Sequence, residues 1–215
     1  MNKGTLWYRG CRSIYRLYYR LYHRGRVINR ECLSNVGGVI LAANHVSFLD
    51  PPLLGAACRR EAFFMARDTL FRNPLAGWLL RSWNCVPIKR EGGDIGALRT
   101  ALRMLGEGKA VLMFPEGTRS KDGNLQEGRA GIGMIVAKSK VPVVPMRIFG
   151  TDRALPRGAS LPRPAQLTIQ FGEPFTYPLP ANVDELRGDA AKALFLDISR
   201  EIMQRIAALE PVTRK

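Results

Sequence analysis

GVILAANHVSFLDPPLLGAAC, residues 38–58, is the stretch that decides the fold. A short apolar run at 38–43 is followed by a polar loop, and an apolar helical segment begins at Pro51. The same order of strand, loop and helix recurs along the chain, and continuous apolar runs are typical of parallel strands buried on both faces. The sequence therefore predicts an α/β fold in a single domain, with a mainly parallel or mixed central sheet flanked by helices.

Segments on either side of this stretch give the other predicted elements. Prolines between 150 and 182 exclude a long helix there and favour a loop around one edge strand. Strands are expected at 38–43, 62–66, 85–89, 110–114, 143–149 and 166–171, and helices at 51–58, 74–83, 95–107, 130–139 and 189–209.

The composition limits the classes of partner. The formal charge of the 215 residues is +15, and residues 1–30 contain eight cations and no acid. Such a charge predicts a polyanionic partner, either an anionic lipid surface or a nucleic acid. The four cysteines form no Cys-x-x-Cys pair, so we expect free thiols in a reducing compartment rather than a metal site.

Residues 1–30 have the pattern of an amphipathic helix. Its aromatic side chains and cations together favour the headgroup zone of a lipid bilayer, so we expect this helix to lie in the membrane interface. No apolar run approaches the ~18 to 20 residues of a spanning helix, and no signal peptide is expected. The alternatives are a helix packed on the domain with its arginines in water, and a nucleic-acid-binding arm. At 100° per residue, one side holds Arg9, Arg12, Arg16, Arg20 and Arg24, and the opposite side holds Trp7, Cys11, Ile14, Tyr18, Leu21 and Tyr22.

His45 and Asp50 are the first catalytic candidates. A turn between them can bring the carboxylate to one ring nitrogen, which fixes the tautomer and leaves the other nitrogen to act as a general base. The structural alternatives are a helix start for Asp50, which precedes Pro51, and a hydrogen-bonded histidine at a strand end. The other histidine, His23, has no acid nearby in the sequence.

A second candidate site is the loop FPEGTRS, residues 114–120, which also follows a predicted strand. Gly117 permits close approach of the backbone to a ligand, and Arg119 offers a planar fork for a phosphate. Glu116 can accept hydrogen bonds from hydroxyls or hold the arginine, although a turn with a surface ion pair has the same pattern. Loops that follow parallel strands lie at one edge of the sheet, so we expect both loops in one crevice, with Lys89 and Arg90 at the same edge.

Four motifs in order resemble those of the 1-acylglycerol-3-phosphate acyltransferases, a family of the glycerolipid acyltransferase superfamily. The resemblance covers about residues 36–150. The motifs are Asn-His-x-x-x-x-Asp at 44–50, Val-Pro-Ile-Lys-Arg at 86–90, Phe-Pro-Glu-Gly-Thr-Arg-Ser at 114–120 and a Val-Pro-Val-x-Pro type strand at 141–146.

The resemblance implies a role for each matching residue. His45 and Asp50 would act as a dyad on the acceptor hydroxyl. The acceptor phosphate would be bound around the third motif, by Glu116, Gly117, Thr118 and Arg119, together with Arg90. Arg67 stands where many members have lysine and is a further candidate for substrate binding. Backbone amides near Gly117 or in the first motif are candidate donors to the oxyanion.

The implied reaction transfers a fatty acyl group to the sn-2 hydroxyl of 1-acylglycerol 3-phosphate, which gives phosphatidic acid. The donor would be the thioester of acyl-CoA or of acyl-acyl carrier protein, with no cofactor and no metal. We expect a membrane-interface helix at 1–30 and the acyltransferase domain at 31–215. The protein is expected to be peripheral, bound to anionic phospholipid at the cytoplasmic face of the membrane. No nucleic-acid partner is expected. Alternatives are acylation of glycerol 3-phosphate or another lysolipid, and a non-catalytic membrane-binding or nucleic-acid-binding protein.

Overall fold

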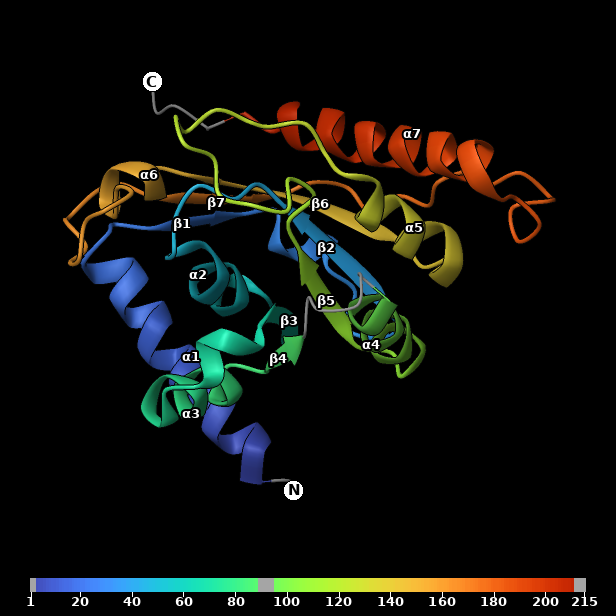
Figure 1. The fold of residues 1–215 in the computed structure, drawn as a ribbon. Helices are drawn as coiled ribbons and strands as arrows, with labels where there is room; N and C mark the ends of the chain where they lie inside the picture. The colour runs from blue at the N-terminus through green and yellow to red at the C-terminus, as the bar shows by residue number, and fades with distance from the viewer. Residues whose placement is uncertain (1–2, 89–94, 211–215) are drawn as a thin grey trace.

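A seven-stranded sheet forms the centre of this computed structural model, which describes residues 3–88 and 95–210 (Figure 1). The spatial order of the strands is β1-β7-β6-β2-β5-β3-β4, and only the β6 and β7 pair is antiparallel. This confirms the predicted α/β fold with a mainly parallel, mixed sheet. The strands are β1 (Arg26–Ile28), β2 (Val39–Ala43), β3 (Ala62–Arg67), β4 (Cys85–Ile88), β5 (Ala110–Met113), β6 (Val143–Phe149) and β7 (Thr168–Phe171).

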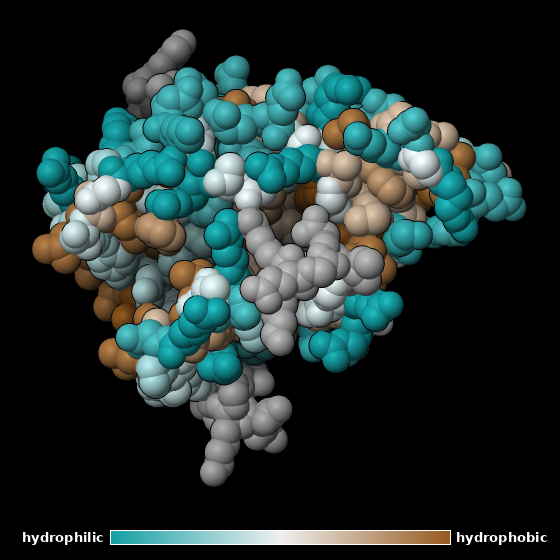
Figure 2. Space-filling model, in the orientation of Figure 1, coloured by the Kyte–Doolittle hydropathy of each residue, from teal (hydrophilic) through white to brown (hydrophobic). Residues whose placement is uncertain are grey.

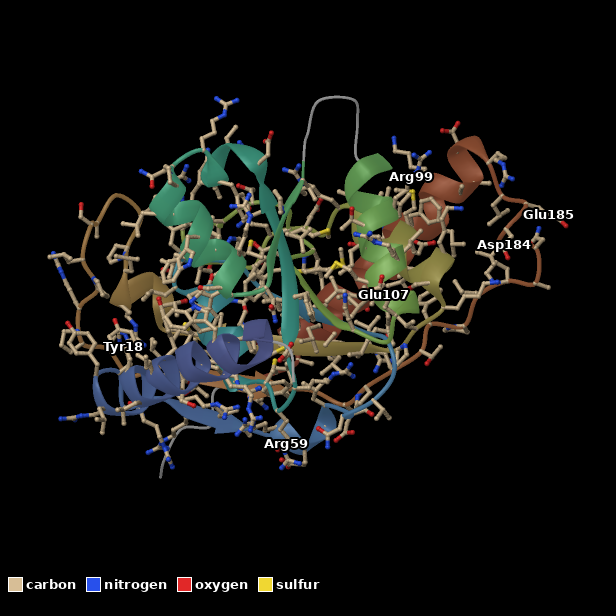
Figure 3. All side chains as sticks on the ribbon, turned by 90° about the horizontal axis from the view of Figure 1, so that it is seen from below. Tyr18, Arg59, Arg99, Glu107, Asp184 and Glu185 are labelled. Carbon is tan, nitrogen blue, oxygen red and sulfur yellow. The ribbon has the colours of Figure 1, made fainter. Side chains whose placement is uncertain are left out.

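Helices cover both faces of the sheet because successive strand residues point to opposite sides. In β2, Val39 and Leu41 pack in the core under α1 and α2, whereas Ile40 and Ala42 pack under α4, α5 and α7. Figure 3 shows Tyr18 of α1 and Arg99 of α4 on different sides of the molecule. The helices are α1 (Lys3–Leu21), α2 (Asp50–Ala57), α3 (Pro74–Ser82), α4 (Ile95–Gly106), α5 (Ala130–Ser139), α6 (Thr151–Ala154) and α7 (Gly188–Ala207), with 3-10 turns at Arg30–Cys32 and Asp68–Phe71.

The predicted strands and the helices after residue 50 lie within a few residues of the observed ones. The helix expected over 1–30 was predicted too long: it ends at Leu21, because Arg24 has the left-handed φ of 47° and the chain then enters a strand. This strand, β1, is one that the sequence did not reveal. It pairs in parallel with β7, with Arg26 opposite Thr168. β1 therefore forms the edge of the sheet, and the prediction that the strand within 150–182 is the edge is wrong. Three residues that include an arginine are too short and too polar to form an apolar run, which explains why the pattern was missed.

The surface of α1 has an inner and an outer side. Tyr8 and Tyr19 are buried against the core, and the guanidinium of Arg16 donates to the carbonyl oxygens of Ala56 and Cys58, both at 2.7 Å. Arg16 thus caps the C-terminal end of α2, where backbone carbonyls lack helical partners. On the outer side, Trp7, Ile14, Leu17 and Leu21 are exposed.

No helix in the described residues combines the length and the apolar composition that crossing a membrane requires.

Candidate active site

The loop between β2 and α2 is anchored where it leaves the sheet. The Asn44 side chain donates to the Ile148 carbonyl oxygen at 3.1 Å and accepts from the Ile148 N–H at 2.8 Å. The Asn44 side chain therefore adds two hydrogen bonds to β6 just beyond the point where β2 ends. The residues after it start from a fixed position at the carboxyl edge of the sheet.

His45 and Asp50 are in direct contact in this loop. The Nδ1 atom of His45 lies 2.8 Å from Oδ2 of Asp50. The backbone N–H groups of Val46 and Ser47 donate to the same oxygen, both at 2.7 Å. Asp50 is fully buried and is the first residue of α2, where a negative charge is favoured by the helix dipole. Asp50 therefore both begins the helix and binds the histidine, two roles that the sequence analysis considered compatible.

The imidazole of His45 is held in one plane. The Phe114 ring stacks on it with the centroids 4.0 Å apart and the planes inclined by 17°. If Asp50 is ionised, Nδ1 carries the proton and Nε2 has a lone pair, an assignment that follows from the hydrogen bond. Nε2 has no hydrogen-bond partner within residues 3–88 and 95–210, and 16% of the side chain is exposed. One nitrogen is thus oriented and the other can receive a proton.

The loop after β5 is hydrogen-bonded to the first loop, as expected for neighbouring parallel strands. The His45 N–H donates to Oε1 of Glu116 at 3.0 Å, and the Ser120 N–H donates to the His45 carbonyl oxygen at 2.8 Å. Gly117 has φ 69°, and a Cβ there would lie 2.9 Å from Cδ of Arg129, so a side chain is disfavoured.

Glu116 is a buried carboxyl group with one unpaired oxygen. Its pKa is raised to about 7, mainly by burial and to a smaller extent by the charge of Asp50, although backbone hydrogen bonds, including that of the His45 N–H, act to lower it. Oε2 is buried and has no hydrogen-bond partner in the part of the chain that the structure describes. Glu116 forms no ion pair with Arg119 there, so it supports the histidine loop and not the arginine.

The cationic candidates differ in their positions. The Arg119 guanidinium lies 3.5 Å from the centroid of the Phe48 ring, so it reaches the first loop. Arg67 is exposed at the end of β3, the neighbour of β5, and therefore lies at the same edge of the sheet. Thr118 is exposed, and Arg90 lies outside the described residues.

Several amides expected as oxyanion donors are already engaged. Those of Val46 and Ser47 donate to Asp50, and that of Gly117 donates to the Phe114 carbonyl oxygen at 3.0 Å. These three groups are therefore not free to bind an oxyanion in this arrangement.

Thr151 is a residue of this site that the sequence analysis missed. Its hydroxyl lies 2.6 Å from Oδ1 of Asp50, and the side chain is fully buried. The available signal was its position: Thr151 lies two residues after the end of β6, at the same edge of the sheet as the two predicted loops.

A family model and several known proteins are similar to this chain. Residues 24–149 match the family model described as Acyltransferase. The chloroplastic 1-acyl-sn-glycerol-3-phosphate acyltransferase LPAT1 of Arabidopsis thaliana is 34% identical over 61% of this chain, and the match spans 38% of that relative's own length. A 1-acyl-sn-glycerol-3-phosphate acyltransferase of Bacillus subtilis is 28% identical over 78% of this chain and 81% of its own.

A crystal structure of the 1-acyl-sn-glycerophosphate acyltransferase PlsC from Thermotoga maritima superposes with a TM-score of 0.70 at 25% identity. The superposition covers 95% of this chain and 81% of that one. The family model covers more than half of the chain and contains both hydrogen-bonded loops. On these grounds, the chain belongs to the acyltransferase family of enzymes.

Proposed function

We propose that this protein is a 1-acylglycerol-3-phosphate O-acyltransferase. It transfers a fatty acyl group from a thioester, acyl-CoA or acyl-acyl carrier protein, to the sn-2 hydroxyl of 1-acylglycerol 3-phosphate and forms phosphatidic acid. The observation that carries the proposal is the contact of His45 Nδ1 with Asp50 beside an unoccupied Nε2. The names of the matched relatives support this acceptor.

His45 acts as the general base. Nε2 takes the proton of the acceptor hydroxyl while its oxygen attacks the thioester carbonyl carbon, and Asp50 stabilises the imidazolium that forms. As the tetrahedral intermediate collapses, the C–S bond breaks and the proton passes from His45 to the leaving thiolate. The products are the ester and a free thiol, and no covalent enzyme intermediate is needed.

Arg119 is proposed to bind the acceptor phosphate together with Arg67, which lies at the same edge of the sheet, and with Arg90, whose role is proposed from its motif alone. A guanidinium presents paired donors that match phosphate oxygens. Arg119 forms no ion pair with an acidic side chain among the described residues, so its donors are available to a ligand. The loop after β5 is proposed to contact the glycerol part of the acceptor. It does so through the unpaired oxygen of Glu116 and through Gly117 and Thr118, which are exposed.

The test is a thiol-release assay that crosses acceptors with donors. The acceptors are 1-acylglycerol 3-phosphate, glycerol 3-phosphate, lysophosphatidylcholine and the unphosphorylated monoacylglycerol, and each is offered acyl-CoA and acyl-acyl carrier protein. We expect turnover with 1-acylglycerol 3-phosphate to exceed that with the other three. Faster reaction with glycerol 3-phosphate contradicts the acceptor assignment, and reaction with an unphosphorylated glycerol lipid alone contradicts the phosphate roles of the arginines.

We also propose that α1 and α3 attach the protein to an anionic membrane surface. The exposed side of α1 is extended by α3, where Trp78 lies 5.3 Å from Trp7 between ring centroids and 74% of Leu75 is exposed. Figure 2 shows apolar side chains on the flank that α1 and α3 occupy in Figure 1. Arg9 and Arg20 are exposed on α1 and can bind anionic headgroups next to the apolar side chains of α1 and α3. The free cysteines agree with the reducing, cytoplasmic face.

Co-sedimentation with vesicles tests the attachment. The double substitution Leu17→Ser with Trp78→Ser is expected to release the protein from vesicles that contain anionic lipid, because it removes apolar side chains from both helices. Val36→Ser is the matched control, since Val36 is also exposed but lies in the loop before β2. Equal release by both variants contradicts the assigned surface.

A further inference from the structure

We propose that Thr151 is a positioning residue of the active site, which sets the plane of the Asp50 carboxylate and through it the orientation of His45. This inference rests on the proposed function for the roles of His45 and Asp50. Thr151 lies outside all the motifs that identify the family in this sequence. Its hydroxyl donates to Oδ1 of Asp50 at 2.6 Å, and both side chains are fully buried.

The two oxygens of Asp50 have different partners. Oδ2 accepts hydrogen bonds from Nδ1 of His45 and from the backbone N–H groups of Val46 and Ser47. Oδ1 accepts a hydrogen bond only from the Thr151 hydroxyl among the described residues. Both oxygens lie off the Cβ–Cγ bond, so the donors to Oδ2 restrain rotation of the carboxylate about that bond from one side, and the Thr151 hydroxyl restrains it from the other. Loss of the donor to Oδ1 lets the carboxylate turn toward its remaining donors, which changes the angle at which Oδ2 meets the Nδ1–H bond.

The chain places Thr151 with little freedom. β6 ends at Phe149, and Gly150 has φ 87°, a backbone conformation that turns the chain into α6. A Cβ at Gly150 would lie 2.5 Å from the Gln166 carbonyl oxygen, so only glycine fits this turn. Thr151 is the next residue and is presented to the active site at the first turn of α6.

A second contact joins the same turn to the histidine loop. The Ser47 hydroxyl donates to the Leu155 carbonyl oxygen at 3.0 Å, and the Leu155 N–H donates to the Thr151 carbonyl oxygen at 2.9 Å. The segment 150–155 therefore holds the loop at two points, Asp50 and Ser47. A hydroxyl that only filled a gap in the core would not require this paired arrangement.

The hydrogen bond also affects how the pair binds a proton. Thr151 stabilises the carboxylate anion, and its removal raises the proton affinity of the coupled His45 and Asp50 pair. The other titratable group that faces the pair is Glu116, from the loop after β5, while Asp152 and Arg153 of α6 are exposed. Loss of the Thr151 hydroxyl should therefore shift the acidic limb of activity to higher pH.

The experiment compares Thr151→Val, which keeps the volume and removes the donor, with Thr151→Ser, which keeps the donor. Initial rates are measured as a function of pH with 1-acylglycerol 3-phosphate and acyl-CoA or acyl-acyl carrier protein, whichever the wild type uses. We expect Thr151→Val to lower kcat about tenfold or more, with KM changed far less, and to move the acidic limb of kcat/KM to higher pH. Thr151→Ser should restore both quantities to near the wild-type values.

Two results overturn the inference. The first is a folded Thr151→Val protein with the kcat and pH profile of the wild type. The second is a Thr151→Ser protein as impaired as Thr151→Val, because it shows that the methyl group and not the hydroxyl matters. If Thr151→Val does not fold, the comparison of wild type with Thr151→Ser and Thr151→Ala decides by the same criteria.

An NMR titration of the His45 ring separates this inference from the proposed function, since it needs no substrate. The His45 ring in Thr151→Val should titrate at higher pH than in the wild type, and an unchanged titration contradicts the role of Thr151. Failure of the wild type to acylate any acceptor contradicts the proposed function alone.

Discussion

The two histidines of the chain occupy opposite kinds of surroundings. His23 is fully buried, its Nε2 lies 3.0 Å from the Tyr18 hydroxyl, and Nδ1 has no hydrogen-bond partner in the described residues. The rings of Tyr18 and Tyr22 stand edge-on to it, both at 4.9 Å between centroids. His45, in contrast, has a carboxylate on one nitrogen and solvent within reach of the other.

This difference shows what turns a histidine into a base. Burial lowers the pKa of His23, so the ring is kept neutral, and no ion pair with an acidic side chain forms at His23 among the described residues. At His45, the imidazolium that would form in the proposed proton transfer has a partner already in place, Asp50. His23 is thus a packing residue of the N-terminal segment, and His45 is the candidate base.

The largest expected effect comes from His45→Ala. Removing a general base should lower kcat/KM by about 10²- to 10⁴-fold, while binding to vesicles is unchanged. His23→Gln is the matched control and should retain activity close to that of the wild type. An active His45→Ala protein contradicts the assignment of His45 as the base. An inactive and well-folded His23→Gln protein contradicts the assignment of His23 as a packing residue.

Asp50→Asn should be nearly as severe. The amide cannot act as the anionic partner of an imidazolium, and its NH₂ group faces N–H donors if it replaces Oδ2, so we expect a loss of about 10²-fold or more in kcat. Circular dichroism melts provide the control for folding. Retention of most of the activity would mean that His45 needs no carboxylate.

Glu116→Gln should have a smaller effect on rate and a clear effect on the pH dependence of stability. The folded pKa of Glu116, about 7, lies above the ordinary glutamate value, so the unfolded chain ionises first as the pH rises. The wild type should therefore lose stability between pH ~4.5 and ~7 relative to the glutamine variant. Thermal melts of both proteins across this range measure the difference. If the melting temperatures of the wild type and of Glu116→Gln change equally with pH, Glu116 is not a buried, neutral group.

The smallest effect is expected for His23→Gln in acid. Because the folded pKa of His23 lies below its unfolded value, the unfolded chain binds the proton first, and stability falls as the pH drops below about 6.5. The glutamine variant should lose less stability over this range. Chemical denaturation at several pH values tests this, and a steeper loss in the variant contradicts it.

Much of the fold was predictable because buried parallel strands have continuous apolar sequences. Val39–Ala43 and Val143–Phe149 are recognisable from their composition, and the loops after parallel strands must gather at one edge. Thr151 was not predictable in the same way, since its partner is 101 residues away along the chain. A single hydroxyl after a strand has no spacing pattern that distinguishes it from an ordinary turn residue.

The arginines of α1 illustrate a second limit. Helical periodicity correctly groups Arg12 and Arg16, but it cannot show what they face. The structure directs Arg16 to backbone carbonyls at the end of α2, and Arg12 contacts the Arg59 carbonyl oxygen at 3.3 Å. Their partners are backbone groups, which leave no mark in the side-chain sequence.

The short helix α2 therefore joins two parts of the proposed function. Its first residue is Asp50, and its last carbonyl groups are held by Arg16 of α1. Eight residues of α-helix extend about 12 Å, and a helix of that length is stiff. In the proposed attachment of α1 to lipid, α2 would act as a spacer between the membrane surface and the active site. The length of this helix would then set the depth at which an acceptor hydroxyl reaches His45.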